Sequence, residues 1–219
     1  MASTAQKRPR LQPAEVCRTI LDATLQLYLE KGYAGTNTDE VAALSSVSKR
    51  TIYHHFADKD ELVREALKLL IAAAEEQGAE SFDVLAQSTD LESDLRSFAR
   101  QHIFDVIQPD IMQVRRRIIS EVERFPDIAR AWYEAAPKRA KEKLAECFEK
   151  LCDRGLLRIA DTEIAAEQFN WLILSIPMNR AMFDADTIED TSRHADYADA
   201  AVEVFLAAYG VRQSPDTRR

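Results

Sequence analysis

Apolar residues recur every three or four positions along most of the chain, which is the spacing that places them on one face of an α-helix. The first such run covers residues 13–32, with Ile20, Ala23, Leu27 and Tyr28 as its apolar positions. A proline at its start and a glycine at its end are typical of helix boundaries. We therefore expect a helix from residue 13 to residue 32.

Two shorter helices are predicted next, separated by a turn at residues 45–47. Thr38 is a suitable N-cap for the first and Ser48 for the second, because a hydroxyl oxygen can accept a backbone N–H bond at a helix start. Ile52 and Phe56 give the second helix an inward face. Two short helices joined by a tight turn form a helix-turn-helix, which presents the N-terminal residues of its second helix to the major groove of DNA.

The outward side of this second helix carries cations and hydroxyl groups, which contact phosphates and base edges. Lys49, Arg50 and Thr51 occupy its first turn and are expected to face the bases. Arg50 can form two hydrogen bonds to a guanine edge, worth about 1–3 kcal/mol of discrimination. The alternative is an ordinary solvated face. The predicted DNA-contacting residues are Thr38, Ser48, Lys49, Arg50, Thr51, Tyr53, His54, His55 and Lys59.

Helical spacing continues almost to the end of the chain. Further helices are expected from Lys59 into the 70s, from Asp90, from Pro109, from Pro126, over residues 140–154, from Asp161 to Phe183, and from about residue 192 to Tyr209. Only 5 glycines and 7 prolines occur in 219 residues, and no alternating β-branched runs are present. The predicted fold class is therefore all-α.

The residues of the helix-turn-helix follow a specific order. Its characteristic positions are Thr36, Thr38, Val41, Ala42, Val47, Ser48, Thr51, Ile52, Tyr53, His55, Phe56, Lys59 and Leu62. With the preceding helix and its glycine stop, this pattern resembles the signature of the TetR family of transcriptional regulators over residues 18–66. One departure lies in the turn, where the family usually has Ala-Gly and this chain has Ser45-Ser46. A serine in a left-handed backbone conformation costs about 1–2 kcal/mol.

Residues 123–129 and 154–157 resemble, less closely, the body of AcrR/AefR-like members of that family. The resemblance implies an N-terminal three-helix helix-turn-helix head and a larger helical body that binds a ligand and dimerises. The expected organisation is a flexible basic tail at residues 1–12, a helix-turn-helix DNA-binding domain at 13–58, an effector-binding and dimerisation domain at 59–212, and a polar tail at 213–219.

The net charge of −8 is unusual for a DNA-binding protein, because such domains are often basic. Residues 1–60 carry eight basic and seven acidic side chains, so the acidic excess lies in the rest of the chain. A near-neutral head can touch phosphates locally while an acidic body stays away from DNA. The basic segment Lys7–Arg10 either adds DNA contacts or only improves solubility.

Dimerisation is expected because one head binds DNA weakly, whereas two heads address half-sites about 34–36 Å apart. The last two predicted helices are apolar on more sides than packing within one chain requires. The resemblance implies a four-helix bundle with two helices from each subunit; a monomer with a thick core is the alternative. The predicted interface residues are Phe169, Ile173, Pro177, Tyr197, Val202, Phe205 and Tyr209.

A pocket for a small, largely apolar effector is expected between the middle helices, where large apolar residues are frequent, although such residues more often form core. One side chain of Arg115–Arg117 is expected to turn inward, toward a ligand carboxylate or toward an acidic residue such as Glu121 or Glu123. The intramolecular pair is the favoured alternative. The predicted effector-contacting residues are Phe98, His102, Met112, Arg115, Trp132, Phe148, Trp171, Ser175, Met178 and Asn179.

Catalysis, metal binding and a cofactor are not predicted, because the histidines at 54, 55, 102 and 194 have no metal-ligand or triad spacing. The three cysteines cannot all pair within the chain, and are interpreted as idle thiols or as redox sensors. No apolar stretch approaches the roughly 20 residues of a membrane span. No membrane contact and a cytoplasmic location are therefore expected.

Together these patterns favour a homodimeric repressor that binds a palindromic double-stranded DNA operator and is released by a small-molecule effector. The alternative is a regulator that binds DNA constitutively or responds to another protein, with no small ligand. The two hypotheses differ in the body, because only the first requires a cavity there.

Overall fold

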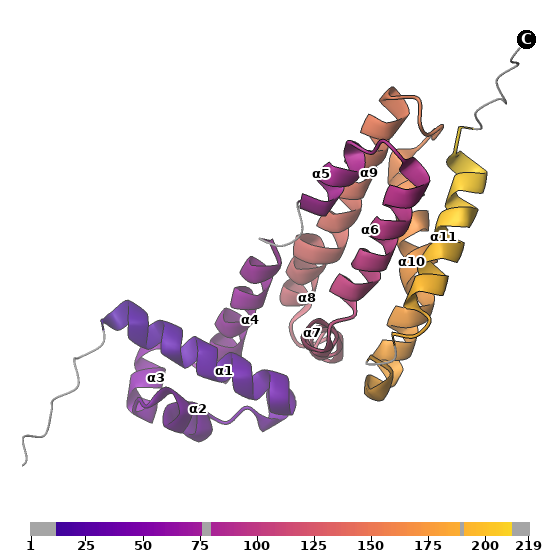
Figure 1. Cartoon of the computed structure of the whole chain (residues 1–219). Coiled ribbons are helices and arrows are strands. Elements are labelled where there is room, and N and C mark those ends of the chain that lie inside the picture. Colours follow the sequence, from indigo (N-terminus) through magenta and orange to yellow (C-terminus); the bar gives the residue numbers. More distant parts are fainter. Residues whose placement is uncertain (1–11, 76–79, 189–190, 212–219) are drawn as a thin grey trace, which may run out of the picture.

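The computed structural model describes residues 12–75, 80–188 and 191–211. Within these ranges every named element is a helix, which confirms the predicted all-helical class. The predicted tails at residues 1–12 and 213–219 lie, apart from Gln12, outside the described residues. The first four helices are α1 (Pro13–Gly35), α2 (Thr38–Ser45), α3 (Lys49–His55) and α4 (Lys59–Glu75). The first three of these form a head at one end of the molecule, and α4 leads from it toward the body (Figure 1).

The two short helices of the head begin at side-chain caps. Ser48 caps α3 as predicted, because its Oγ accepts a hydrogen bond from the Thr51 N–H at 3.1 Å. The cap of α2 is not Thr38, as predicted, but the preceding Asn37, whose Oδ1 accepts from the Asp39 N–H at 2.8 Å. Asparagine is a stronger N-cap than threonine. The N-cap is therefore one residue earlier than predicted, and Thr38 is the first residue inside the helix.

The long helix α1 continues past the glycine at which we expected it to stop. Gly32 has a φ of 72° and kinks the helix, which then runs to Gly35. The side chain of Arg117 approaches this kink, because a Cβ on Gly32 would lie only 3.0 Å from its Nη1. Glycine therefore suits this position for two reasons: its freedom at positive φ, and the close approach of Arg117.

The body is a helical bundle. Its elements are α5 (Glu80–Ala86), α6 (Leu91–Val106), α7 (Pro109–Ser120), α8 (Pro126–Tyr133), the π-helical turn η1 (Glu134–Lys138), α9 (Arg139–Asp153), α10 (Thr162–Phe183), the short 3-10 turn η2 (Ala185–Ile188) and α11 (His194–Tyr209). Helix α6 packs against α10 and α11, and α9 packs against α5 and α10 (Figure 1). Among the described residues, none of the helices is long and apolar enough to cross a bilayer.

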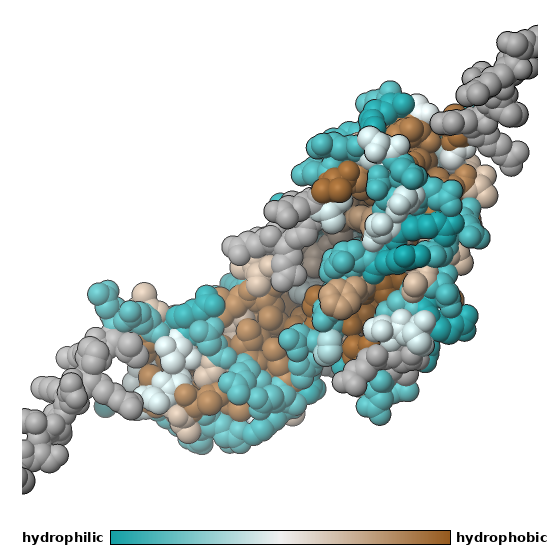
Figure 2. Space-filling model, in the orientation of Figure 1, coloured by the Kyte–Doolittle hydropathy of each residue, from teal (hydrophilic) through white to brown (hydrophobic). Residues whose placement is uncertain are grey.

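Buried apolar side chains form three clusters among the described residues. The head cluster contains Ile20, Ala23, Leu27, Val41, Ile52, Phe56 and Leu62. The junction cluster, between head and body, contains Tyr28, Val63, Leu67, Ile118, Phe125, Ile128 and Trp132. The third and much larger one, the body cluster, lies among α5 to α11 and includes Phe98, Phe148, Phe169 and Phe205. Figure 2 shows apolar side chains also at the surface where the head meets the body.

Candidate nucleic-acid interface and ligand cavity

The first turn of α3 is solvent-exposed and cationic. Lys49 and Arg50 are exposed, whereas Ile52 on the opposite side of the helix belongs to the head cluster. Ser48 Oγ lies 2.8 Å from Thr51 Oγ1, so two hydroxyl groups stand together at the helix N-terminus. Cations and hydroxyls thus share one accessible surface, which is the arrangement that a groove-reading helix needs.

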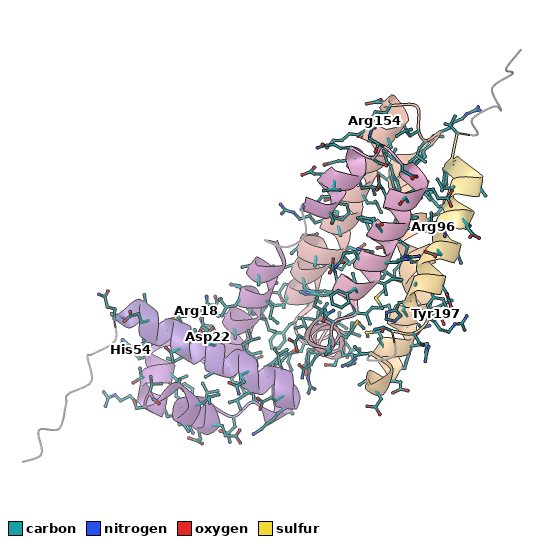
Figure 3. The ribbon with its side chains drawn as sticks, viewed as in Figure 1. Arg18, Asp22, His54, Arg96, Arg154 and Tyr197 are labelled. Carbon is teal, nitrogen blue, oxygen red and sulfur yellow. The ribbon has the colours of Figure 1, made fainter. Side chains whose placement is uncertain are left out.

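Tyr53 extends this surface from α3 onto α2. Its side chain is exposed, and its hydroxyl lies 3.4 Å from Thr38 Oγ1. His54 is also exposed and His55 is half-buried. Figure 3 shows His54 on the head, far from Arg154 in the body. The predicted DNA-contacting residues are therefore brought together on α2, α3 and the start of α4, and their contact with DNA remains a prediction.

Two of the predicted cations already have partners in the protein. Lys49 Nζ lies 3.0 Å from the carboxylate of Asp39, and this hydrogen bond raises the pKa of Lys49. Lys59 Nζ lies 4.3 Å from the ring centroid of Tyr33. Arg50 forms no ion pair or hydrogen bond through its side chain with any described residue. It can therefore meet a phosphate or a base without giving up an existing contact.

Replacing Ser46 with glycine is expected to raise the free energy of unfolding by about 1 kcal/mol. Ser46 has a φ of 57° and a ψ of 30°, the left-handed region in which a side chain is strained. Part of the gain is offset because glycine loses more backbone entropy on folding. Urea unfolding followed by circular dichroism measures the change.

The neighbouring Ser45 provides a matched control for that variant. It is helical and buried, and its hydroxyl donates to the Val41 carbonyl at 2.6 Å, so Ser45→Gly should lower the stability. If Ser46→Gly is no more stable than the wild type, the backbone at this turn is not strained.

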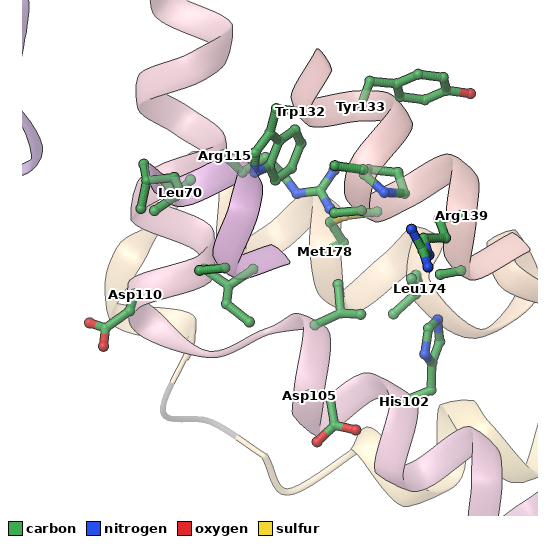
Figure 4. Close-up of a pocket in the computed structure, with 18 of the residues that line it drawn as sticks. Leu70, His102, Asp105, Asp110, Arg115, Trp132, Tyr133, Arg139, Leu174 and Met178 are labelled. Atoms are coloured by element: carbon green, nitrogen blue, oxygen red, sulfur yellow. The ribbon is translucent and has the colours of Figure 1, made fainter. Parts of the chain in front are cut away.

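A cavity of about 740 Å³ lies between the head and the middle of the body. Helices α1 and α4 line it from one side, and α5 to α10 line it from the other. Figure 4 shows Arg115 and Trp132 next to each other in this cavity, together with Met178, Leu174 and His102. Most of its lining is apolar, with a few polar groups, as is usual for small-molecule sites.

The structure brings six of the ten predicted effector-contacting residues to this cavity. They are Phe98, His102, Arg115, Trp132, Trp171 and Met178. The other four do not line it. Met112 and Phe148 are fully buried in the body cluster, because they face the interior of the bundle. Ser175 and Asn179 are exposed, because they lie on the solvent-facing side of α10.

The three consecutive arginines of α7 have three different surroundings. Arg116 donates to the Ala181 carbonyl at 2.8 Å, and Arg117 donates to the carbonyls of Leu29 and Glu30 at 3.0 and 2.9 Å. Arg115 faces the cavity, with its guanidinium carbon 5.0 Å from the centroid of the Trp132 ring. The expected pairing of the inward arginine with Glu121 or Glu123 is not observed, because Arg115 faces the Trp132 ring while Glu121 lies 3.8 Å from Arg124.

His102 is a second polar group of the cavity. Its ring stacks on Phe98, with centroids 5.6 Å apart, and its Nε2 lies 3.0 Å from Oδ1 of Asn170. Burial lowers the pKa of His102 and outweighs the opposing hydrogen bond to Asn170. The imidazole is therefore neutral at pH 7. Among the described residues no cluster of His, Cys, Asp and Glu is placed to hold a metal ion.

Sequence reasoning did not name the residues that α1, α4 and α9 contribute to this cavity. Leu25 and Leu29 of α1 and Leu70 of α4 line it, with Lys141 of α9. The helical spacing of α1 places Leu25 and Leu29 beside its core positions, and only the docking of the body on α1 turns them into cavity residues. No local signal in the sequence reports that docking.

Five of the seven predicted interface residues are unavailable for contact with another chain. Phe169, Ile173, Pro177, Val202 and Phe205 are buried within the subunit, so their prediction as an interface is wrong. Tyr197 and Tyr209 are partly buried. The reason lies in α10 and α11, whose most apolar stripes pack on α6 and α9 and complete the core of the subunit.

A different apolar face of the same two helices is exposed. Leu172 and Ile176 of α10 are 38% and 50% exposed, and Val204 of α11 is 56% exposed. The Tyr209 hydroxyl donates to Oε1 of Gln168 at 2.6 Å, which joins the outer sides of the two helices. We call this surface, formed by Gln168, Leu172, Ile176, Val204 and Tyr209, the outer face.

The thiol groups differ in accessibility. Cys147 is buried, and burial raises the pKa of its thiol to about 12, so it is almost never ionised at neutral pH. Cys17 and Cys152 are partly exposed, and all three thiols are free. Cys147 therefore fits the interpretation as an idle thiol.

Two family models match the chain. The model of bacterial regulatory proteins of the tetR family matches residues 20–66, and the model of the C-terminal domain of AefR-like transcriptional repressors matches residues 93–211. The first covers the head and the second covers most of the body. The two matches thus account for nearly all of the described helices.

Individual proteins are similar as well. The transcriptional regulator AcrR of Shigella flexneri is 26% identical over 53% of this chain and 51% of its own length, so the aligned part spans about half of that relative. A crystal structure assigned to the TetR family from Mesorhizobium loti is 34% identical, with a TM-score of 0.80 over 92% of this chain and 100% of that one. The flavonoid-responsive regulator FrrA is 28% identical, with a TM-score of 0.67 over 91% and 100% of the two chains.

Proposed function

Because the chain belongs to the TetR family of bacterial transcriptional regulators, we propose that it is a homodimeric repressor released from a palindromic operator by a small effector. In this proposal residues 13–58 bind DNA, and residues 59–212 bind the effector and dimerise, in the cytoplasm. The observation that carries the proposal is the cavity, because both head and body helices line it. A ligand there touches both parts at once.

The first turn of α3 is the proposed reading surface. Lys49, Arg50 and Thr51 would contact base edges, and the remaining residues would hold the DNA backbone. Those remaining residues are Thr38, Ser48, Tyr53, His54, His55 and Lys59. Two copies of α3 on one dimer would address half-sites about 34–36 Å apart, and we propose the outer face of α10 and α11 as the surface that joins them.

Helix α7 offers a connection between the cavity and the head. Its Arg115 faces the cavity, while its Arg117 and Gln113 donate hydrogen bonds to the Leu29 carbonyl, just before the Gly32 kink of α1, each at 3.0 Å. The Tyr28 hydroxyl donates in return to the Arg117 carbonyl at 3.3 Å. A shift of α7 by a ligand would therefore move α1. Changing the DNA-competent fraction from 99% to 1% requires about 5.5 kcal/mol of differential affinity.

Two further observations support an organic effector. The cavity favours a small-molecule regulator over the alternative that binds DNA constitutively or responds to a protein, since that alternative needs no hollow body. FrrA, whose name describes it as responsive to flavonoids, is similar to this chain over nearly its whole length. We therefore include in the proposal that the effector is an aromatic compound.

Operator binding tests the proposal directly. Fragments of the DNA upstream of the gene are titrated with the protein and followed by fluorescence anisotropy at two salt concentrations. We expect one fragment to bind about 10³-fold or more tightly than scrambled DNA. Equal, weak and steeply salt-dependent binding to every fragment would contradict an operator in this region.

An Arg50→Ala variant is expected to lose about 1–3 kcal/mol of operator affinity, which is about fivefold to 150-fold, because Arg50 would no longer contact a base. The affinity difference between operators that carry different bases should become smaller at one position of each half-site, the position that Arg50 would contact. Arg130→Ala, at an exposed position of α8 in the body, is the control and should bind like the wild type. A uniform loss across all operator variants would instead assign Arg50 to a phosphate.

A further inference from the structure

The cavity contains a cation, Arg115, that has no counter-charge among the side chains that the structure describes. Arg115 is mostly enclosed, its Nε is buried without a hydrogen-bond partner, and its side chain forms no ion pair with any described residue. Its described interaction is with the ring of Trp132, 5.0 Å away. Burial lowers the pKa of Arg115, yet a guanidinium remains charged at neutral pH. A buried charge without a partner destabilises a protein unless something else neutralises it.

The described acidic residues of the lining do not fill that role. Asp22, Asp105 and Asp110 line it, but none forms a salt bridge with Arg115. Figure 4 shows the carboxylates of Asp105 and Asp110 turned outward, away from Arg115. Asp22 is paired with Arg18 one turn earlier on α1, at 3.0 Å. Each of these carboxylates is exposed and already solvated.

The other cations of the lining differ from Arg115. Lys141 forms a salt bridge with Glu167, and its Nζ lies 3.2 Å from the Tyr133 hydroxyl. Arg139 is exposed at the rim. Lys143 also lines the cavity and is half-buried, without an ion pair to any described residue. Arg115 differs from it because, among the described residues, its Nε is the buried side-chain nitrogen that has no hydrogen-bond partner, so its charge is left for a ligand.

We propose that the cavity binds an organic anion, whose single carboxylate pairs with the guanidinium of Arg115 and whose aromatic or apolar body packs among Phe98, Trp132 and Met178. This inference rests on the proposed function, since it specifies the chemical class of the effector in the same cavity. A planar guanidinium can donate two parallel hydrogen bonds to a carboxylate, which gives both affinity and orientation. The neutral His102 adds a polar contact but no second charge, so one anionic group is enough.

The size of the cavity agrees with this class. About 740 Å³ accommodates a drug-sized molecule of several fused or linked rings. Leu25, Leu70 and Leu174 add apolar surface to the lining of the cavity. An apolar surface that encloses a cation left unpaired by the described residues is complementary to an amphipathic acid rather than to a neutral polar molecule.

A matched pair of fluorescent probes tests the inference. Anilinonaphthalene sulfonate and N-phenyl-naphthylamine share the same ring system, and only the first carries an anionic group. The wild type is expected to bind the anionic probe about tenfold or more tightly than the neutral one, because a charge-assisted pair with Arg115 is added. In Arg115→Met this preference should disappear or reverse, and in Arg115→Lys it should be partly retained. Equal affinity of the wild type for both probes would overturn the inference.

Arg139→Met is the matched control, since it removes a cation from the rim of the same cavity. It should keep the preference for the anionic probe. If it loses the preference as fully as Arg115→Met does, the general potential of the cavity and not Arg115 selects the anion, and the inference fails. Naphthoate should displace the anionic probe, whereas the neutral naphthamide should not. This outcome would extend the result from the sulfonate to carboxylates.

Thermal unfolding of the unliganded proteins separates ligand binding from a structural role. Arg115→Met should melt at the same temperature as the wild type or higher, because it removes an unpaired buried charge. A clearly lower melting temperature would show that Arg115 supports the fold, and would overturn the inference. Operator release is measured separately: an acid that binds through Arg115 but leaves operator affinity unchanged supports this inference and contradicts the proposed switch.

Discussion

A Val204→Glu variant is expected to be monomeric and to bind the operator about 100-fold more weakly than the wild type or worse. Val204 is 56% exposed on the outer face, beside the exposed Leu172 and Ile176 of α10. In an isologous dimer the same patch of both subunits meets, so one substitution introduces two carboxylates into an apolar contact. The loss of the second head removes the gain of bivalent binding. Sedimentation analysis and operator anisotropy measure the two effects.

Val84→Glu is the control for this variant. Val84 is 70% exposed on α5, so the same change of side chain falls on a helix outside the proposed interface. We expect this control to remain dimeric and to bind the operator normally. A Val204→Glu protein that sediments as a dimer would show that the outer face of α10 and α11 is not the interface.

A Phe169→Ala variant is expected to lose about 3–5 kcal/mol of unfolding free energy. Phe169 is fully buried, and its ring centroid lies 4.6 Å from that of Phe205, 5.7 Å from that of Phe148 and 6.4 Å from that of Phe98. Removing this ring leaves a void at the centre of the body cluster, which the surrounding helices cannot fully close. Urea unfolding at fixed protein concentration measures the loss, since the proposed dimerisation would make stability depend on concentration.

Phe104→Ala provides the comparison, because Phe104 is 58% exposed on the outer side of α6. This variant should lose less than about 1 kcal/mol. If Phe169 were part of a dimer contact, as its place in an apolar helix had suggested, its replacement would dissociate the dimer while leaving the subunit stable. Loss of subunit stability instead assigns it to the core.

The sequence was most informative where local chemistry determines structure. The caps at Ser48, Asp90 and Asp161 all begin helices as predicted, because a side-chain oxygen at a helix start depends only on its close neighbours. The positive φ of Ser46 likewise agrees with the departure noticed in the turn. The order of residues in the head was specific enough to indicate the family from the sequence alone.

Sequence periodicity was least informative for α10, which is apolar on several sides. One stripe contains Phe169 and Ile173, and another contains Leu172 and Ile176, so spacing alone does not say which stripe faces the core. The packing of α6 and α9 decides this, and it buries the first stripe. The same limit applies to Arg115–Arg117, because three consecutive residues on a helix point in three directions and only the neighbouring helices determine what each one meets.

The separation of the apolar clusters has a consequence for the dynamics of the chain. Among the described residues, the head cluster has only seven buried members, and it does not merge with the larger body cluster. Regions with few buried contacts open at a lower cost than the rest of a protein. We therefore expect backbone amides of α2 and α3 to exchange with deuterium while those of α6 and α10 remain protected. The part of the chain that we propose to read DNA would then be the first to open and the part most ordered by its target.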